Sequence, residues 1–318
     1  GGFICVDELG RGSQGAVFKA KRRDPATNGV IMDENGEEKL YAVKIIDRSG
    51  LTNINNLMAI TSEVGTLLRL THANIVALES KFLSLDLVHV VMECVGQRHL
   101  HDELVSRESR SFSLDEAQHH LYALTDAVAY LQYQGYCHRD LKPENIAWVD
   151  PTTSLPRGKL VVLDFGLAQA CEPCEVLARA CGTVPFCSPQ ILYRNPYSGL
   201  KNDSWSLGII ALEVLLGPGI IHTAVDIPDH LAGAPSDELA DMVVEFFQDP
   251  ANIAGMFQDS AERPPDVAVE YVQISLRPNE ADRATCHEML NSAWFGKEAA
   301  SSEHRQFPPG HRKGAVSK

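Results

Sequence analysis

The sequence has no apolar run long enough to cross a lipid bilayer. Its longest run, residues 207–216, is interrupted by Glu213, whereas a membrane-spanning helix needs ~20 consecutive apolar residues. We interpret this run as a buried helix and predict no membrane partner.

The sequence also has no excess of basic residues. Its 28 lysines and arginines are outnumbered by 42 aspartates and glutamates, which gives a formal net charge of −14. Proteins that gather on nucleic acids or anionic lipids need a basic face. We therefore predict no nucleic-acid partner. The acidic balance weakly favours basic protein partners, and the sequence does not indicate an oligomeric state.

A disulfide framework is not indicated either. The chain has only eight cysteines in 318 residues and no recognisable signal peptide, a combination typical of a reducing compartment. We expect a cytoplasmic or nuclear location. Cys171 and Cys174 have a C-x-x-C spacing that leaves three interpretations open: free structural thiols, a redox switch, or a zinc site, although zinc normally requires a second pair of ligands.

The order of patterns along the chain predicts an α+β fold. Strand-like segments span residues 3–46, helical periodicity follows over 56–70, and strands return at 87–94. Beyond residue 113 the pattern is mainly helical, with short strands near Ile146 and Val161. Residues 33–38 form a charged turn that lacks the glycine and closing glutamate of a calcium loop. The polar tail, residues 296–318, is predicted to be disordered.

A glycine-rich segment follows Leu9. Gly10, Gly12, Gly15 and Val17 fit a G-x-G-x-x-G-x-V pattern, in which glycines let backbone N–H groups approach phosphate oxygens without a Cβ in the way. The same glycine spacing also occurs in dinucleotide-binding folds. A strand after the loop, rather than a helix, favours a phosphate-covering hairpin.

Lys44 ends the segment Tyr41-Ala42-Val43-Lys44 among apolar neighbours. Its distance from the glycine loop suits a cation that binds the α- and β-phosphates of a nucleotide. Glu63, on the following predicted helix, is the candidate ion-pair partner, with an ordinary surface carboxylate as the alternative.

Two further strings are far more specific. Residues 138–145 read His-Arg-Asp-Leu-Lys-Pro-Glu-Asn, and residues 164–166 read Asp-Phe-Gly. Phosphoryl transfer needs a carboxylate to orient the attacking hydroxyl and accept its proton, and oxygen ligands for Mg²⁺. Asp140 suits the first task, and Asn145 and Asp164 suit the second. Both strings, after a glycine loop and a strand lysine, are very improbable by chance.

These motifs together resemble the eukaryotic-type protein kinase family, in its serine/threonine class, over residues 9–295. The resemblance implies a bilobed fold, with a small β-rich N-lobe carrying one regulatory helix (residues 1–95) and a larger, mainly helical C-lobe (residues 96–295). It implies ATP and Mg²⁺ as cofactors in the cleft, and a protein substrate with a serine or threonine acceptor.

The resemblance also assigns roles to matching positions. Asp140, Lys142, Lys44 and Glu63 correspond to catalytic positions, and Asn145 and Asp164 to metal ligands. The nucleotide-binding positions are Leu9, Gly10, Gly12, Gly15, Val17, Ala42, Lys44, Met92, Glu93, Val95 and Ala147, with Met92 at the back of the adenine slot and the backbones of Glu93 and Val95 meeting the base.

Two departures from the family pattern bear on regulation. Gln190 stands where the family has a glutamate that pairs with Arg283. We therefore expect a weaker interaction between residue 190 and Arg283. No Ser, Thr or Tyr lies between Gly166 and Thr183, so the segment offers no phosphate acceptor. We therefore predict activity that does not depend on phosphorylation of this segment, with Glu172 or Glu175 supplying charge to Arg139.

Two other functions remain open at this point. A pseudokinase that acts as a binding module would tolerate Gln190, although retention of Lys44, Asp140 and Asp164 argues against it. A small-molecule kinase is disfavoured by Gly182-Thr183 and by residues 203–205, which in relatives support peptide docking. Glu144 suits an arginine on the substrate, but His99 stands where basophilic relatives often have an acid, so substrate preference is open.

Overall fold

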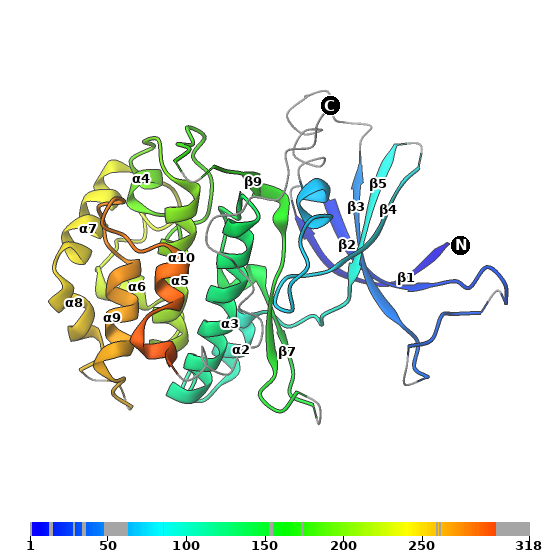
Figure 1. The fold of residues 1–318 in the computed structure, drawn as a ribbon, viewed down its shortest axis with the longest axis horizontal. Coiled ribbons are helices and arrows are strands. Elements are labelled where there is room, and N and C mark those ends of the chain that lie inside the picture. Colours follow the sequence, from blue (N-terminus) through cyan, green and yellow to red (C-terminus); the bar gives the residue numbers. More distant parts are fainter. Residues whose placement is uncertain are drawn as a thin grey trace.

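A computed structural model describes residues 2–12, 15–27, 29–33, 36–47, 63–84, 86–152, 155–172, 174–258, 260 and 262–296. A small antiparallel sheet forms the N-terminal part and a larger helical assembly the C-terminal part (Figure 1). The predicted α+β fold with a β-rich first lobe and a helical second lobe is confirmed. The predicted disordered tail beyond residue 296 lies outside the described residues.

The N-terminal sheet has five strands in the order β1-β2-β3-β5-β4. They are β1 (Phe3–Gly12), β2 (Gly15–Arg22), β3 (Leu40–Asp47), β4 (Leu78–Ser84) and β5 (Leu87–Glu93). In β3, Tyr41 and Val43 pack with Ala20 and Val91 on one face. Because side chains alternate along a strand, Ala42 and Lys44 face the other way, toward the second lobe.

Strand β4 was not predicted, because its side chains are almost all exposed and its sequence, LESKFLS, offers no buried face to detect. Of the predicted helix over 56–70, the described part is helical at residues 63–67 and turns at 68–69. The rest of that helix lies outside the described residues. The predicted turn at 33–38 is supported by a hydrogen bond from the Asp33 amide to the Glu37 carbonyl, at 2.7 Å.

The C-terminal lobe is built on helices that share one apolar core. The helices are α2 (Leu100–Ser106), α3 (Leu114–Tyr133), α4 (Pro189–Leu192), α5 (Gly199–Leu216), α6 (Ile220–Ala224), α7 (Asp237–Gln248), α8 (Pro250–Met256), α9 (Asp266–Ser275) and α10 (Cys286–Leu290). Helix α5 is buried along nearly its whole length, as expected for its apolar sequence. No helix in the described part of the chain has the length and apolar character to cross a membrane.

Short strands carry the loops that face the N-terminal sheet. The predicted strands near Ile146 and Val161 are β7 (Ile146–Val149) and β8 (Lys159–Val162), which pair with each other. Two-residue strands β6 (Tyr136–Cys137) and β9 (Gln169–Ala170) also pair, and were too short to be recognised by periodicity. The described residues also include the 3-10 turns η1 (Pro143–Asn145), η2 (Phe165–Leu167) and η3 (Ala293–Phe295).

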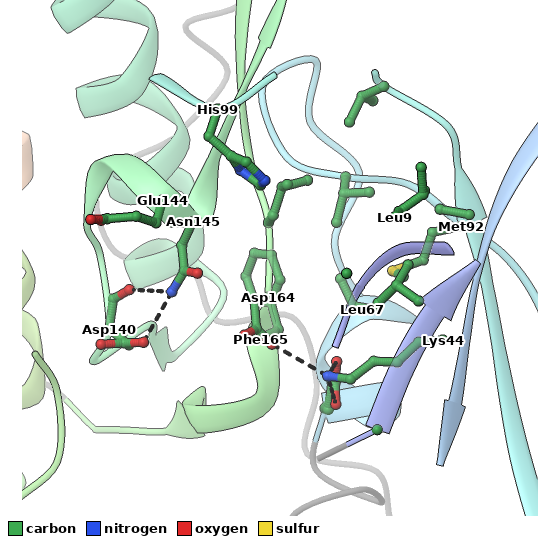
Figure 2. A pocket seen from close by; sticks show the side chains of 18 of the residues that line it. Leu9, Lys44, Leu67, Met92, His99, Asp140, Glu144, Asn145, Asp164 and Phe165 are labelled. Carbon is green, nitrogen blue, oxygen red and sulfur yellow. Dashed lines mark hydrogen bonds and ion pairs between the residues drawn. The ribbon is translucent and has the colours of Figure 1, made fainter. Parts of the chain in front are cut away.

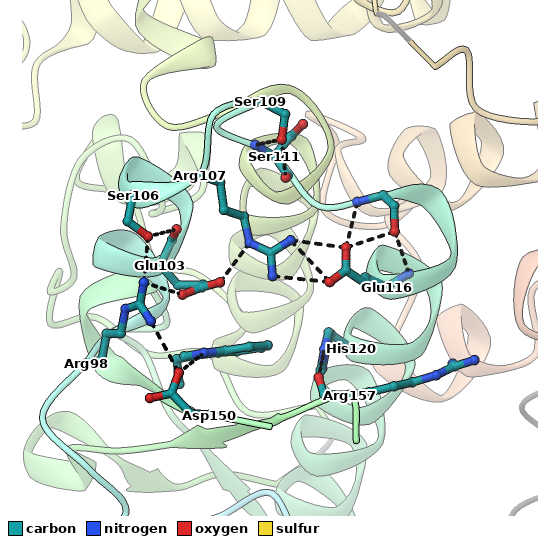
Figure 3. A network of polar contacts seen from close by, with 12 residues as sticks. Arg98, Glu103, Ser106, Arg107, Ser109, Ser111, Glu116, His120, Asp150 and Arg157 are labelled. Carbon is teal, nitrogen blue, oxygen red and sulfur yellow. Dashed lines mark hydrogen bonds and ion pairs between the residues drawn. The ribbon is translucent and has the colours of Figure 1, made fainter. Parts of the chain in front are cut away.

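A charged network centred on Arg107 joins α2 to the start of α3 (Figure 3). The Arg107 Nε donates to Glu103 at 2.8 Å, and its Nη1 donates to Glu116 at 3.1 Å. Its guanidinium also lies 4.1 Å from the centroid of the Phe112 ring. Glu103 is buried and pairs with Arg98 as well. A buried carboxylate with two cationic partners holds α2 firmly beside the cleft.

Candidate active site

A cavity of about 510 Å³ lies between the sheet and the helical lobe, a volume that suits a small-molecule ligand. The predicted nucleotide-binding residues that line it are Leu9, Gly10, Gly15, Val17, Ala42, Lys44, Met92, Glu93 and Val95. Asp140, Lys142, Asn145, Asp164 and Glu63 line it as well. The structure thus brings residues as far apart in the sequence as Leu9 and Asp164 to one cavity (Figure 2).

Gly15 shows why the loop requires glycine. It has φ of +142°, and a Cβ at this position would collide with the carbonyl oxygen of Ile45. Gly12 ends β1 directly opposite Gly15 in the β1–β2 register. The tip between them, Ser13 and Gln14, lies outside the described residues.

Lys44 contacts two carboxylates at the inner end of the cavity. Its Nζ lies 2.7 Å from Glu63 Oε1 and 3.3 Å from Asp164 Oδ1 (Figure 2). Burial opposes the charge on Lys44, but the two carboxylates outweigh it and raise the pKa of the lysine. Burial likewise opposes the charge on Asp164, yet the nearby Lys44 ammonium lowers the pKa of that carboxyl. Burial raises the pKa of Glu63 despite the adjacent ammonium of Lys44. The charged forms of Lys44 and Asp164 are therefore favoured by their mutual contact.

Asp140 lies across the cavity from Lys44, at the centre of a second polar cluster (Figure 2). The Thr183 hydroxyl donates to Asp140 Oδ1 at 2.7 Å, and the Asn145 amide donates to Oδ2 at 3.0 Å. Lys142 Nζ lies 3.1 Å from Oδ2 and donates to the Thr183 hydroxyl at 2.7 Å. These contacts fix the orientation of the carboxylate.

A carboxylate of α5 holds the backbone next to Asp140 in place. Buried Asp203 accepts hydrogen bonds from the amides of His138 and Arg139, at 2.7 and 2.8 Å. Arg139 has φ of 70° and Asp164 has φ of 52°. Non-glycine residues rarely adopt positive φ, and where they do the surrounding contacts must hold them there.

Arg139 does not have the predicted acidic partner. Its Nε donates to the Leu167 carbonyl at 2.7 Å. Burial opposes the charge on Arg139, but the neighbouring Cys181 and Tyr197 side chains raise its pKa. Neither Glu172 nor Glu175 is among the groups that act on the charge of Arg139, and in the described chain its Nη1 is buried without a hydrogen bond. Glu175 accepts a bond from the Glu172 amide at 3.0 Å, so their own tight turn directs that carboxylate away from Arg139.

Some lining residues had no signal in the sequence, and two predicted nucleotide-binding residues, Gly12 and Ala147, are not among the described lining residues. Leu67, Val76 and Leu163 also line the cavity; each is an ordinary apolar residue in sequence, so no signal distinguished it. Ala147 is buried in β7 and its backbone bridges to His99, which does line the cavity.

Known proteins carry the same sequence pattern. A model of the protein kinase domain matches residues 3–295. Calcium/calmodulin-dependent protein kinase type IV from Mus musculus, like that from Homo sapiens, is 34% identical over 215 residues, covering 68% of this chain and 41% of each relative. Calcium/calmodulin-dependent protein kinase type 1 from Macrobrachium nipponense is 28% identical over 303 residues, covering 95% of this chain and 77% of that protein.

The matched region thus spans about two fifths of the type IV relatives, but the family match covers almost all of this chain. The motif residues that define the match also meet around a single cavity. This chain belongs to the protein kinase family.

Proposed function

We propose that this chain transfers the γ-phosphoryl group of Mg-ATP to serine and threonine hydroxyls of proteins. The observation that carries the proposal is the simultaneous contact of Lys44 with Glu63 and Asp164. Kinases need the lysine–glutamate pair and the metal-binding aspartate in place together. Buried or half-buried charges are costly to a fold, so we would not expect a chain without catalytic activity to retain three of them in this arrangement.

The nucleotide would lie in the cavity between residues 1–95 and residues 96–295. Leu9, Val17 and Ala42 supply apolar contacts for a flat base, with Met92 at the back of the slot. The backbones of Glu93 and Val95 supply hydrogen bonds to it. The glycine segment that ends at Gly15 lets the backbone approach phosphate oxygens, and the Lys44 ammonium neutralises them.

The chemistry of the donor set fits magnesium, which prefers oxygen ligands. Asp164 offers a carboxylate whose side chain is 51% exposed to the cavity. The Asn145 amide nitrogen is engaged by Asp140, so its amide oxygen is the atom left to serve as a ligand. Bound Mg²⁺ would neutralise phosphate charge as it develops.

Asp140 would orient the acceptor hydroxyl and take its proton. Its carboxylate is already aligned by Thr183 and Asn145, so little reorganisation is needed. Lys142, which bridges Asp140 and Thr183, places a positive charge where the transferred phosphoryl would pass. Different residues would therefore bind the nucleotide and act on the acceptor hydroxyl.

We further propose that activity does not require phosphorylation of residues 167–182, since this segment has no hydroxyl side chain. The neutral carbonyl of Leu167 accepts a hydrogen bond from Arg139 in place of a phosphate. The exposed Glu144 at the rim of the cavity suits a basic residue on the protein substrate.

The experiment is a transfer assay with labelled Mg-ATP, a peptide array with serine, threonine and tyrosine acceptors, and a set of small hydroxyl compounds. Transfer to serine and threonine peptides, absent in Asp140→Asn, supports the proposal. Nucleotide binding without transfer would identify a pseudokinase. Transfer to small compounds alone would identify a small-molecule kinase.

A further inference from the structure

The polar network of Figure 3 reaches the wall of the cavity at Arg98. Residues 95–97 and His99 line the cavity, whereas Arg98 between them is not among the described lining residues. Its guanidinium instead donates to Asp150 at 3.2 Å and to Ser106 at 2.6 Å (Figure 3). The contacts of Arg98 therefore hold the cavity wall on both sides of this residue.

Glu103 links Arg98 to Arg107 from a buried position. Its Oε1 accepts a hydrogen bond from Arg107 Nε at 2.8 Å, and its Oε2 lies 2.8 Å from Arg98 Nη2. Glu103 is 6% exposed, and in the described chain its Oε2 has no hydrogen bond. A buried carboxylate is costly without an opposite charge beside it. The ion pair with Arg98 therefore compensates this oxygen.

Arg107 is held in turn by the start of α3. Its Nη1 and Nη2 donate to Glu116, in the first turn of that helix, at 3.1 and 3.2 Å. Its guanidinium also lies within cation–π distance of the Phe112 ring. Helix α3 supplies a large part of the core of the second lobe. The network thus connects a core helix, through Glu103, to the segment that forms the cavity wall.

Backbone hydrogen bonds hold the same segment independently of the Glu103 carboxylate. The Trp148 amide donates to the Arg98 carbonyl at 2.8 Å, and the Glu103 amide donates to the His99 carbonyl at 3.0 Å. These bonds remain when the charge of Glu103 is removed. Loss of that charge should therefore shift the segment without unfolding it.

We propose that Glu103 is a positioning residue that sets the affinity of the cavity for its nucleotide. The inference rests on the proposed kinase function, in which the nucleotide is Mg-ATP and Val95 meets the base. Without the Glu103 charge, Arg98 and Arg107 would be like charges at close range and would repel each other. Residues 95–99 would then move away from the position that the nucleotide requires.

The residues that carry the chemistry are held by other contacts. Lys44 pairs with Glu63 and Asp164. Asp140 accepts a hydrogen bond from Thr183. A shift of the cavity wall should therefore weaken binding of the nucleotide equally in the ground state and in the transition state. Such a loss raises KM for ATP and leaves kcat unchanged.

The test compares the affinity of the purified chain and its variants for Mg-ATP by calorimetry, together with KM and kcat. Glu103→Gln keeps the size of the side chain and removes its charge, and it should raise both Kd and KM about tenfold. Glu108→Gln, which deletes the same charge at an exposed position two residues beyond α2, is the matched control and should change neither value.

Arg98→Met provides a second variant on a side chain that is 40% exposed, so its folding does not depend on tolerance of a buried change. It should also raise Kd for Mg-ATP. If Glu103 acts through Arg98, the double variant should bind no more weakly than Arg98→Met alone. Additive losses in the double variant would overturn this route.

A lower melting temperature with unchanged affinity for Mg-ATP, in both Glu103→Gln and Arg98→Met, would show that the network is purely structural and would overturn the proposal. The affinity measurement needs no phosphoryl transfer. A wild-type chain that binds Mg-ATP without transferring phosphate would therefore contradict the proposed kinase function, while the comparison of affinities would still decide the role of Glu103.

Discussion

The Arg283 guanidinium donates to the amide oxygen of Gln190 at a distance of 2.9 Å. Arg283 is 1% exposed, and its other hydrogen bonds go to the carbonyls of Arg277, Lys201 and Pro278. Its guanidinium also lies 5.0 Å from the centroid of the Trp205 ring. In the described chain this cation has no carboxylate within ion-pair distance, and burial lowers the pKa of Arg283 to about 10.

Gln190→Glu should therefore stabilise the protein. A carboxylate at this position would form a charge-assisted pair with a buried cation, although it would lose the 2.8 Å bond from Gln190 to the Pro278 carbonyl. We expect a net gain of about 1 kcal/mol in the free energy of unfolding, measured by urea titration. Gln190→Leu, which can form neither bond, should lower stability. A loss of stability in Gln190→Glu would show that the neutral acceptors already satisfy Arg283.

Asp140→Asn should separate catalysis from nucleotide binding. The substitution keeps the shape of the side chain but removes the charge that accepts the proton, so turnover should fall about 10²–10⁴-fold. ATP affinity, measured by calorimetry, should change little, since Asp140 lies across the cavity from Lys44 (Figure 2). Near-wild-type turnover would refute the role assigned to Asp140.

Asp164→Asn should weaken Mg-ATP binding as well as turnover. The variant loses the charge of a proposed metal ligand and also the 3.3 Å ion pair with Lys44. Affinity for ATP should then depend much less on Mg²⁺ than in the wild-type chain, which a magnesium titration would measure. An unchanged magnesium dependence would rule out Asp164 as a ligand.

Glu213 should make stability depend on pH. It is 5% exposed and accepts a bond from the Gly219 amide at 3.0 Å, and burial raises its pKa from 4.5 to about 7. Between these values the folded state binds more protons than the unfolded state, so stability falls as pH rises. The penalty is complete above about pH 7 and corresponds to at most about 3 kcal/mol.

Glu213→Gln is neutral at every pH and should remove this penalty. Its melting temperature should exceed that of the wild-type chain at about pH 8, and the difference should shrink toward about pH 5. Glu245→Gln deletes the same charge at an exposed position of α7 and serves as the control. An equal gain in both variants would point to net charge instead of burial.

Phosphatase treatment should leave turnover unchanged, because residues 167–182 contain no phosphate acceptor. The contacts of Arg139 lead to a sharper expectation. Tyr197→Phe removes a hydroxyl that neighbours Arg139 and donates to the Arg179 carbonyl at 3.2 Å. This variant should lower kcat several-fold, whereas Glu172→Gln with Glu175→Gln should not. Mass spectrometry establishes the phosphorylation state beforehand. Loss of activity on dephosphorylation would place control at a phosphate elsewhere in the chain.

The candidate site residues could be predicted from the sequence because most of them lie in short strings. Asp140 and Asn145 are five positions apart, and Asp164 stands beside Phe165 and Gly166. Local spacing therefore predicted residues that the structure brings to one cavity. Strand β4 was missed for the opposite reason: an exposed strand has no apolar alternation.

Long-range contacts were decided only by the tertiary structure. The sequence by itself determined that Arg139 lacks a phosphate and that Cys171 is followed by Cys174. It did not determine that the Arg139 side chain would donate to the Leu167 carbonyl, or that the Cys171 amide would donate to the Gly135 carbonyl. Those contacts depend on the β6–β9 pairing and on the position of α5. Such placement is set by packing of the whole core, because no local pattern specifies which distant side chains will share a buried space.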